Sequence, residues 1–210
     1  MKIEALEESK HIRGRYLVHL SDQSILKVTE NEIAAFHLSP GQELDEATMQ
    51  SLKEAGTRSN AHSLAAKLIS YRPQSRSELV QHMKEKGIAE EDAEEAADWL
   101  EELGALDDQA YACSIVRHYS QRDYGQKKIE SELYRRGIDK QYWETAMKEA
   151  APPQEGISRV LERKLQGKDP NDPKELRRVS DALLRRGYTW SQIQEGLRVY
   201  GSQVETDDAC

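Results

Sequence analysis

Hydrophobic residues beyond about residue 60 recur at helical spacing, and the whole pattern repeats every fifty residues. In each copy two apolar residues lie four positions apart on one helical face, and a glycine preceded by a basic residue follows after four more. The nine aligned residues are Leu79, Ile129, Val179, Met83, Leu133, Leu183, Gly87, Gly137 and Gly187. A fixed period of this length indicates stacked supersecondary units, so the pattern predicts a repeat architecture.

A glycine directly after a helix, behind a basic last turn, is typical of a left-handed C-cap, so each of these glycines is predicted to end a helix. Two further helical patterns flank each of these helices, which makes the predicted unit three helices. The expected helices are residues 61–71, 76–86 and 90–103; 108–121, 126–136 and 140–150; and 154–166, 173–186 and 190–200. Predicted N-caps stand at Ser75 with Glu78, Asp107, Asp139, Asp172 before Pro173, and Thr189 with Gln192. We therefore expect a mainly all-α chain of three tandem three-helix repeats, stacked into an elongated, curved, solenoid-like array.

The first sixty residues have a different period. Two short β-prone runs, 16–20 and 25–28, are separated by a polar turn and predict a β-hairpin. A short helix from Thr29 to about Phe36 and a second one, capped by Asp45 and ending near Ala55, are expected to follow. The expected domains are residues 1–60, repeats at 61–106, 107–151 and 152–201, and a flexible acidic tail at 202–210, because Gly201 is predicted to end the last helix.

Several functional classes lack their usual signals. No apolar run approaches the roughly 18 residues of a membrane-spanning helix, and the acidic N-terminus is unlike a signal peptide, so we expect a cytoplasmic chain. The two cysteines are too few for a disulfide framework, and Cys113 is expected to be a buried small hydrophobe. The sequence has no phosphate-binding glycine loop, no HExxH or GxSxG motif, and no zinc-type Cys/His spacing. We expect no enzyme activity, no cofactor and no metal.

Charge is distributed unevenly along the chain. The net charge of −8 divides into −3 for residues 1–60, −7 for 61–110, +2 for 111–150, +3 for 151–200 and −3 for the tail. The acidic run at 90–95 is either a solvated helix face or a patch that meets a basic protein groove. Basic pairs directly before Gly137 and Gly187 complement helix C-termini, which explains them without a ligand. The pairs at 127–128 and 177–178 have no such explanation and are stronger candidates for contacting phosphate or an acidic partner.

The candidate partner-binding residues are all basic, and they are Arg72, Arg76, Lys127, Lys128, Arg135, Arg136, Arg177, Arg178, Arg185 and Arg186. One tryptophan lies on the third helix of each unit, where packing in the core is the ordinary expectation for Trp99, Trp143 and Trp190. Tyr111, Tyr119 and Tyr124 are expected to be more exposed, and stacking of these aromatic rings on nucleic-acid bases is an alternative role.

Three segments together resemble the RecX family of bacterial recombinase regulators. They are YRPQSRSEL at 71–79, GALDDQAYA at 104–112, and GQKKIESELYRRGI at 125–138. The first is similar to the opening of that family's first helical repeat, the second to its "G-x-[IL]-D-D-x-x-[FY]-A" junction between repeats, and the third to its "G-x-x-[KR]-[IL]-x-x-E-L-x-x-[KR]-G" segment. Their order and spacing make the joint match specific, and the resemblance extends over about residues 65–200.

The resemblance implies three tandem three-helix repeats and a regulator that is not an enzyme. Members of that family bind the RecA filament and restrain its ATPase, its strand exchange and its stimulation of repressor self-cleavage, in DNA repair and the SOS response. The implied partner is the RecA filament, with single-stranded DNA inside it as a further possible contact, and a monomer is expected. The residues themselves leave two alternatives open: a stand-alone helical nucleic-acid-binding module, and a helical-repeat scaffold for another protein.

Overall fold

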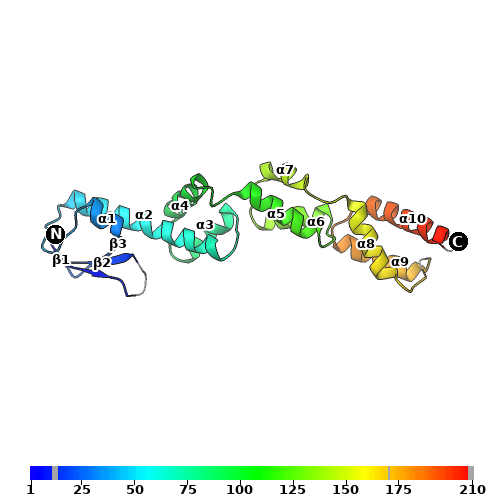
Figure 1. Cartoon of the computed structure of the whole chain (residues 1–210), viewed down its shortest axis with the longest axis horizontal. Helices are drawn as coiled ribbons and strands as arrows, with labels where there is room; N and C mark the ends of the chain where they lie inside the picture. Colours follow the sequence, from blue (N-terminus) through cyan, green and yellow to red (C-terminus); the bar gives the residue numbers. More distant parts are fainter. Residues whose placement is uncertain (11–13, 170, 208–210) are drawn as a thin grey trace. The chain divides into compact units, whose positions relative to one another are not determined.

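The computed structural model describes residues 1–10, 14–169 and 171–207 of the chain. These residues form two compact units (Figure 1). Unit 1 comprises Met1–Pro73 and Glu78–Leu106, and unit 2 comprises Gln74–Ser77 and the chain from Asp107 onward. Throughout the described part, no helix is long and apolar enough to cross a membrane.

Unit 1 begins with a three-stranded antiparallel sheet. Its strands are β1 (Ile3–Glu8), β2 (Arg15–Leu20) and β3 (Ile25–Thr29), in the order β1-β2-β3. The predicted hairpin of β2 and β3 is confirmed, with Tyr16 opposite Val28. The structure adds a third strand that was not predicted, because β1 pairs with the other side of β2. Its sequence, IEALEE, is rich in glutamate, which strands disfavour, and it gave no strand signal.

Two helices follow the sheet, α1 (Glu30–Ala35) and α2 (Glu46–Tyr71). Both predicted starts are confirmed: Thr29 donates its backbone N–H to the Glu32 carboxylate, and Asp45 accepts from the backbone N–H of Thr48 at 2.7 Å. The expected break near residues 55–61 is absent, so the two predicted helices are one.

Tertiary contacts explain why α2 continues through residues of poor helix propensity. A Cβ at Gly56 would lie 2.9 Å from the backbone oxygen of Lys27, so the glycine lets β3 approach the helix. Asn60 accepts a hydrogen bond of 2.8 Å from the buried Arg15 side chain of β2. Residues that look like helix breakers in the sequence are thus contacts between the helix and the sheet.

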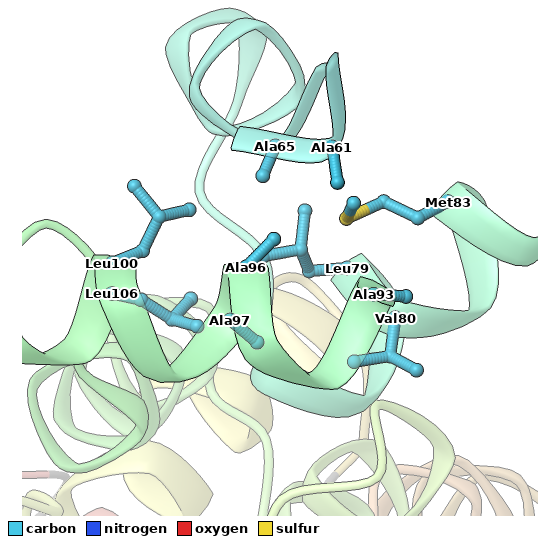
Figure 2. Close-up of a cluster of buried hydrophobic side chains, with 10 residues drawn as sticks. All are labelled: Ala61, Ala65, Leu79, Val80, Met83, Ala93, Ala96, Ala97, Leu100 and Leu106. Carbon is cyan, nitrogen blue, oxygen red and sulfur yellow. The ribbon is translucent and has the colours of Figure 1, made fainter. Parts of the chain in front are cut away.

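The remainder of unit 1 is a three-helix arrangement of the C-terminal half of α2, α3 (Arg76–Glu85) and α4 (Glu90–Glu102). Figure 2 shows its core, in which small side chains of α2 and α4 face larger ones of α3. The core residues are Ala61, Ala65, Leu79, Val80, Met83, Ala93, Ala96, Ala97, Leu100 and Leu106. Because alanine occupies little volume, α2 and α4 can pack closely against each other.

Unit 2 opens with α5 (Asp108–Ser120), α6 (Gln126–Arg135), the 3-10 turn η1 (Lys140–Tyr142) and α7 (Trp143–Met147). The predicted caps at Asp107 and Asp139 are confirmed by side-chain hydrogen bonds to Ala110 and Gln141. The single helix expected at 140–150 is instead a 3-10 turn followed by a short α-helix. The Trp143 indole donates to the Ile138 carbonyl at 3.0 Å, which ties the start of α7 back to the preceding turn.

The last three helices are α8 (Pro153–Leu165), α9 (Pro173–Arg185) and α10 (Trp190–Asp207). The caps at Asp172 and at Thr189 with Gln192 are confirmed. The prediction that Gly201 ends the last helix is wrong, since α10 continues to Asp207. Gly201 does not adopt a positive φ and acts only as a residue of low helix propensity. Of the predicted flexible tail at 202–210, residues 202–207 are therefore helical, and 208–210 lie outside the described residues.

The glycines that mark the fifty-residue period end α3, α6 and α9 as predicted. Their φ angles are +85° at Gly87, +65° at Gly137 and +90° at Gly187, all in the left-handed region. The aligned apolar positions are buried in all three helices. The C-cap glycines and the buried apolar positions therefore recur with the same period of fifty residues.

Candidate partner-binding surface

The second helices of the repeats in unit 2, α6 and α9, have one buried and one exposed face. Ile129 and Leu133 of α6 and Val179 and Leu183 of α9 are at most 2% exposed. Exposed side chains occupy the opposite side at matching positions. We call these residues the outer face, and they are Lys127, Ser131 and Tyr134 on α6 and Arg177, Asp181 and Leu184 on α9. A partner can therefore reach equivalent positions on two consecutive repeats.

Arg135 and Arg136 both contact one buried carboxylate, that of Glu132. Arg135 donates to it at 2.5 and 3.1 Å, and Arg136 donates through Nε at 2.8 Å. Hydrogen bonds from Arg135, together with those from Arg136, lower the pKa of Glu132 from 4.5 to about 2, against the opposing effect of burial. Arg136 also donates to the Tyr111 hydroxyl, and its guanidinium lies 5.6 Å from the centre of that ring. Arg136 is thus part of the internal structure of the second repeat.

Arg186 has a comparable internal role one repeat later. Its guanidinium donates to the backbone oxygen of Arg122 at 2.7 Å and to that of Asp123 at 3.2 Å, and lies 5.2 Å from the centre of the Tyr124 ring. These groups belong to the turn between α5 and α6, so Arg186 connects the third repeat to the second. The sequence explained this arginine by the helix C-terminus alone and did not reveal the connection.

Asp123 is the centre of this contact. It is 6% exposed and has a positive φ of +59°, which is uncommon for a residue other than glycine. Its carboxylate accepts from Arg159 at 2.8 Å and from Arg163 at 3.4 Å, both on α8. Burial, and after it the Asp123 carboxylate, raises the pKa of the neighbouring Tyr188 to about 12, so this phenol stays neutral. Two arginines compensate the buried charge, which makes the turn a fixed element of unit 2.

Backbone groups complete the joint between these repeats. Gly125 donates its N–H to the carbonyl of Arg186 at 2.8 Å, and Lys127 donates to that of Gly187 at 3.2 Å. A Cβ at Gly187 would lie 2.3 Å from the backbone nitrogen of Lys128, so only glycine fits there without displacement. The half-buried Lys128 is therefore part of the joint, whereas the side chain of Lys127 is exposed.

Residues 74–77, which belong to unit 2, make a related contact with the end of α6. The Ser75 hydroxyl donates to the Arg136 carbonyl, and a Cβ at Gly137 would lie 2.4 Å from the Ser77 hydroxyl oxygen. Ser75 and Ser77 stand fifty residues before Gly125 and Lys127. Equivalent positions therefore meet at both places, through a serine hydroxyl at the first and through backbone amides at the second.

Some of the other predicted basic residues form ion pairs, and others do not. Arg72 lies 3.9 Å from Glu78, and Arg178 lies 2.5 Å from Glu175. Arg76 is half-buried, and its backbone N–H donates to the Asp108 carboxylate at 2.8 Å. Of the ten candidates, the exposed cations that form no ion pair with any described side chain are Lys127, Arg177 and Arg185. These three are the most available to a partner.

The structure also tests the expectations about aromatic residues and Cys113. Trp99 and Trp143 pack partly buried against hydrophobic cores, as expected, but Trp190 is 53% exposed and the prediction of a core position is wrong. Trp190 is the first residue of α10. Tyr111, Tyr119 and Tyr124 are partly buried. Cys113 is buried as predicted, and burial, with Glu149 nearby, raises the pKa of its thiol.

One cavity lies close to the candidate surface. A cavity of about 280 Å³ in unit 2 lies beside the joint, and its lining is mostly apolar, with Ile129, Met147 and Pro152 among its residues. In the described ranges, no three His, Cys, Asp or Glu residues are grouped so as to hold a metal ion.

Comparison with known proteins identifies the repeats. Models of the first, second and third three-helix domains of RecX match residues 61–100, 107–147 and 154–197, in that order. The chain belongs to the RecX family. A regulatory protein RecX of Pelodictyon phaeoclathratiforme is 31% identical over 153 residues, which cover 70% of this chain and 93% of that protein. The regulatory protein RecX of Limosilactobacillus reuteri is 29% identical over 194 residues, covering 90% of this chain and 73% of the relative.

The fold of this RecX family member agrees with the same assignment. A crystal structure of a regulatory protein RecX superimposes with a TM-score of 0.70 at 26% identity, covering 92% of this chain and 97% of the other. The predicted family and the predicted class of fold, a mainly helical chain of three-helix repeats, are thereby confirmed.

Proposed function

We propose that this chain binds the filament that RecA forms on DNA and inhibits its ATPase, strand exchange and coprotease activities. The observation that supports this most strongly is the match of three consecutive RecX three-helix domains to the three repeats. The regulatory names of the relatives agree with a binding role rather than a catalytic one.

The outer face of unit 2 is the proposed site of contact. Lys127, Arg177 and the adjacent Arg185 are exposed and form no ion pair with a described side chain, although Asp181 lies on the same face. Such cations can meet acidic side chains of a filament subunit or the phosphates of its DNA. The acidic first turn of α4 in unit 1 is proposed to meet a basic part of the same partner.

The function is tested by titrating this protein into the single-stranded-DNA-dependent ATPase of its cognate RecA. We expect the rate to fall, and a fall at well below one regulator per RecA subunit would indicate an effect that spreads along the filament. An unchanged rate at excess regulator, with active RecA in the same tube, would contradict the proposal.

Charge reversal tests the residues of the contact. Lys127→Glu combined with Arg177→Glu should raise the half-inhibitory concentration about tenfold, because two attractions become repulsions. Lys128 and Arg178 are left unchanged, since the first lies in the joint and the second pairs with Glu175.

The matched control is Lys140→Glu combined with Lys148→Glu. Both lysines are exposed in unit 2 and outside the outer face, so the change in net charge is the same. The control should inhibit within about twofold of the parent chain. Equal losses in the two double variants would show that net charge alone matters and would contradict the assignment.

A further inference from the structure

The outer face carries a second regularity besides its charge. Seven large hydrophobic side chains in the described part of the chain are exposed, and they are Met1, Ile25, Tyr71, Leu103, Tyr134, Leu184 and Trp190. Tyr134 and Leu184 alone among them stand fifty residues apart, at the same position of α6 and α9. Tyr134 is 75% exposed and Leu184 is 43% exposed. Scattered exposed apolar residues are ordinary, but equivalent ones in consecutive repeats form a pattern.

Each apolar side chain shares a helix face with a cation. Lys127 precedes Tyr134 by seven residues, and Arg177 precedes Leu184 by the same interval. Seven residues are two helical turns, so cation and apolar side chain lie on one side of the helix about 10 Å apart along its axis. The equivalent positions of α3 hold Ser77 and Lys84, so the first repeat lacks the combination.

We infer that Tyr134 and Leu184 are paired anchors for a protein partner, each seated in an apolar recess beside acidic side chains. An aliphatic side chain cannot stack on a base, so what the two positions share is apolar volume and not an aromatic face. This favours a protein over a nucleic acid. Tyrosine and arginine are enriched at the energetic centres of protein interfaces.

The repetition identifies the kind of partner. Two equivalent anchors on one rigid unit fit a partner that presents the same recess more than once, as an assembly of identical subunits does. This inference rests on the proposed function, under which the subunits are those of the RecA filament. It adds that adjacent repeats make equivalent apolar contacts, in addition to the electrostatic ones.

The test compares Tyr134→Ala, Leu184→Ala and their combination in the full-length chain. Binding to RecA assembled on single-stranded DNA is measured by cosedimentation, and binding to the same DNA without RecA is measured in parallel. Each single variant should weaken filament binding about tenfold, with a larger loss for the combination, while binding to bare DNA stays unchanged.

Unit 1 supplies matched controls of the same residue types. Tyr71 is 73% exposed and Leu103 is 61% exposed, so Tyr71→Ala and Leu103→Ala remove similar exposed surface elsewhere. These variants should bind the filament within about twofold of the parent chain. Far-UV circular dichroism of every variant should match the parent, because the substituted side chains are exposed.

The outcomes separate the inference from the function on which it rests. If the parent chain does not bind the filament, both fail. If the parent binds and the combined variant binds equally well, or if only one of the two singles is affected, the paired-anchor inference alone fails. An equal loss on bare DNA would assign the two residues to nucleic acid. A parental dimer that the substitutions convert to a monomer, seen by analytical ultracentrifugation, would assign them to self-association, and either result would overturn the inference.

Discussion

Glu132 shows how single residues in this chain combine local and tertiary roles. It lies on α6, and its side chain is 5% exposed. Its carboxylate pairs with both Arg135 and Arg136, the two arginines directly before Gly137. From the sequence, this arginine pair is explained by the helix C-terminus, and the acidic partner three residues earlier is one of many glutamates. Only the fold shows that this carboxylate is buried and that Arg136 also reaches Tyr111.

Glu132→Gln should destabilise the chain at neutral pH by about 1–2 kcal/mol, because a buried carboxylate loses its charge-assisted hydrogen bonds. The folded pKa of about 2 lies below the ordinary value of 4.5, so the contribution is complete above about pH 4.5 and is lost as the pH falls toward 2. Urea denaturation at pH 7, 4 and 3, followed by tryptophan fluorescence, measures this. The difference between parent and variant should shrink with falling pH.

Glu130→Gln is the control for that measurement. Glu130 lies on the same helix, accepts a hydrogen bond from Gln126 at 2.7 Å and forms no ion pair with a described cation. Its substitution should change the free energy of unfolding by less than about 0.5 kcal/mol at each pH. A difference between parent and Glu132→Gln that stays constant from pH 7 to pH 3 would contradict the role given to the ion pairs.

At the scale of elements, glycines at equivalent positions of the repeats differ in what surrounds them. Gly87 and Gly187 adopt nearly the same φ, +85° and +90°, but a Cβ at Gly87 would meet nothing within 4 Å, whereas one at Gly187 would overlap the Lys128 backbone. The sequence predicts the C-cap at both positions. It does not predict that the C-cap of α9 is also a surface against which α6 begins.

Gly187→Ala should therefore cost more stability than Gly87→Ala. The left-handed conformation alone costs about 1 kcal/mol for alanine, and the overlap with backbone atoms should bring the loss at Gly187 to about 3 kcal/mol. Thermal denaturation of both variants, followed by far-UV circular dichroism, tests the ranking. Equal losses would mean that the joint relaxes freely around an added methyl group.

The elements also show where prediction from sequence is reliable in this chain. Helix starts at Asp107, Asp172 and Thr189 followed from local capping chemistry and were confirmed. Two of the errors, the missed strand at Ile3–Glu8 and the break predicted within α2, arise where partners distant in sequence decide the structure. Gly56 and Asn60 have poor helix propensity, and their contacts with the sheet are invisible until the sheet is known.

For the whole molecule, the uneven charge bears on what it binds. Residues 111–200 are basic, but the complete chain carries −8, which opposes strong non-specific attraction to DNA. Of the candidate surface, the sequence identified the cations and their period. It could not show that Arg136 and Arg186 are committed to internal contacts, or that Tyr134 and Leu184 are exposed, because both depend on which side of each helix is covered.

We expect the intact chain to bind bare single-stranded DNA weakly, with a dissociation constant above roughly 10 µM at about 0.15 M salt. Binding to the RecA–DNA filament should be at least about tenfold tighter under the same conditions. Fluorescence anisotropy of a labelled oligonucleotide, with and without RecA, measures both. Submicromolar binding to bare DNA that falls steeply with salt would instead favour the stand-alone nucleic-acid-binding module.

The joint between the second and third repeats has a consequence for how such chains can diverge. Besides the inward-facing side chain of Arg186, the joint uses backbone hydrogen bonds from the amides of Gly125 and Lys127 to the carbonyls of Arg186 and Gly187. The alignment of one repeat against the next therefore does not depend on the side chains that face outward. Under the proposed function, substitutions at outward positions can therefore change which recombinase is bound while the spacing between the contacts stays the same.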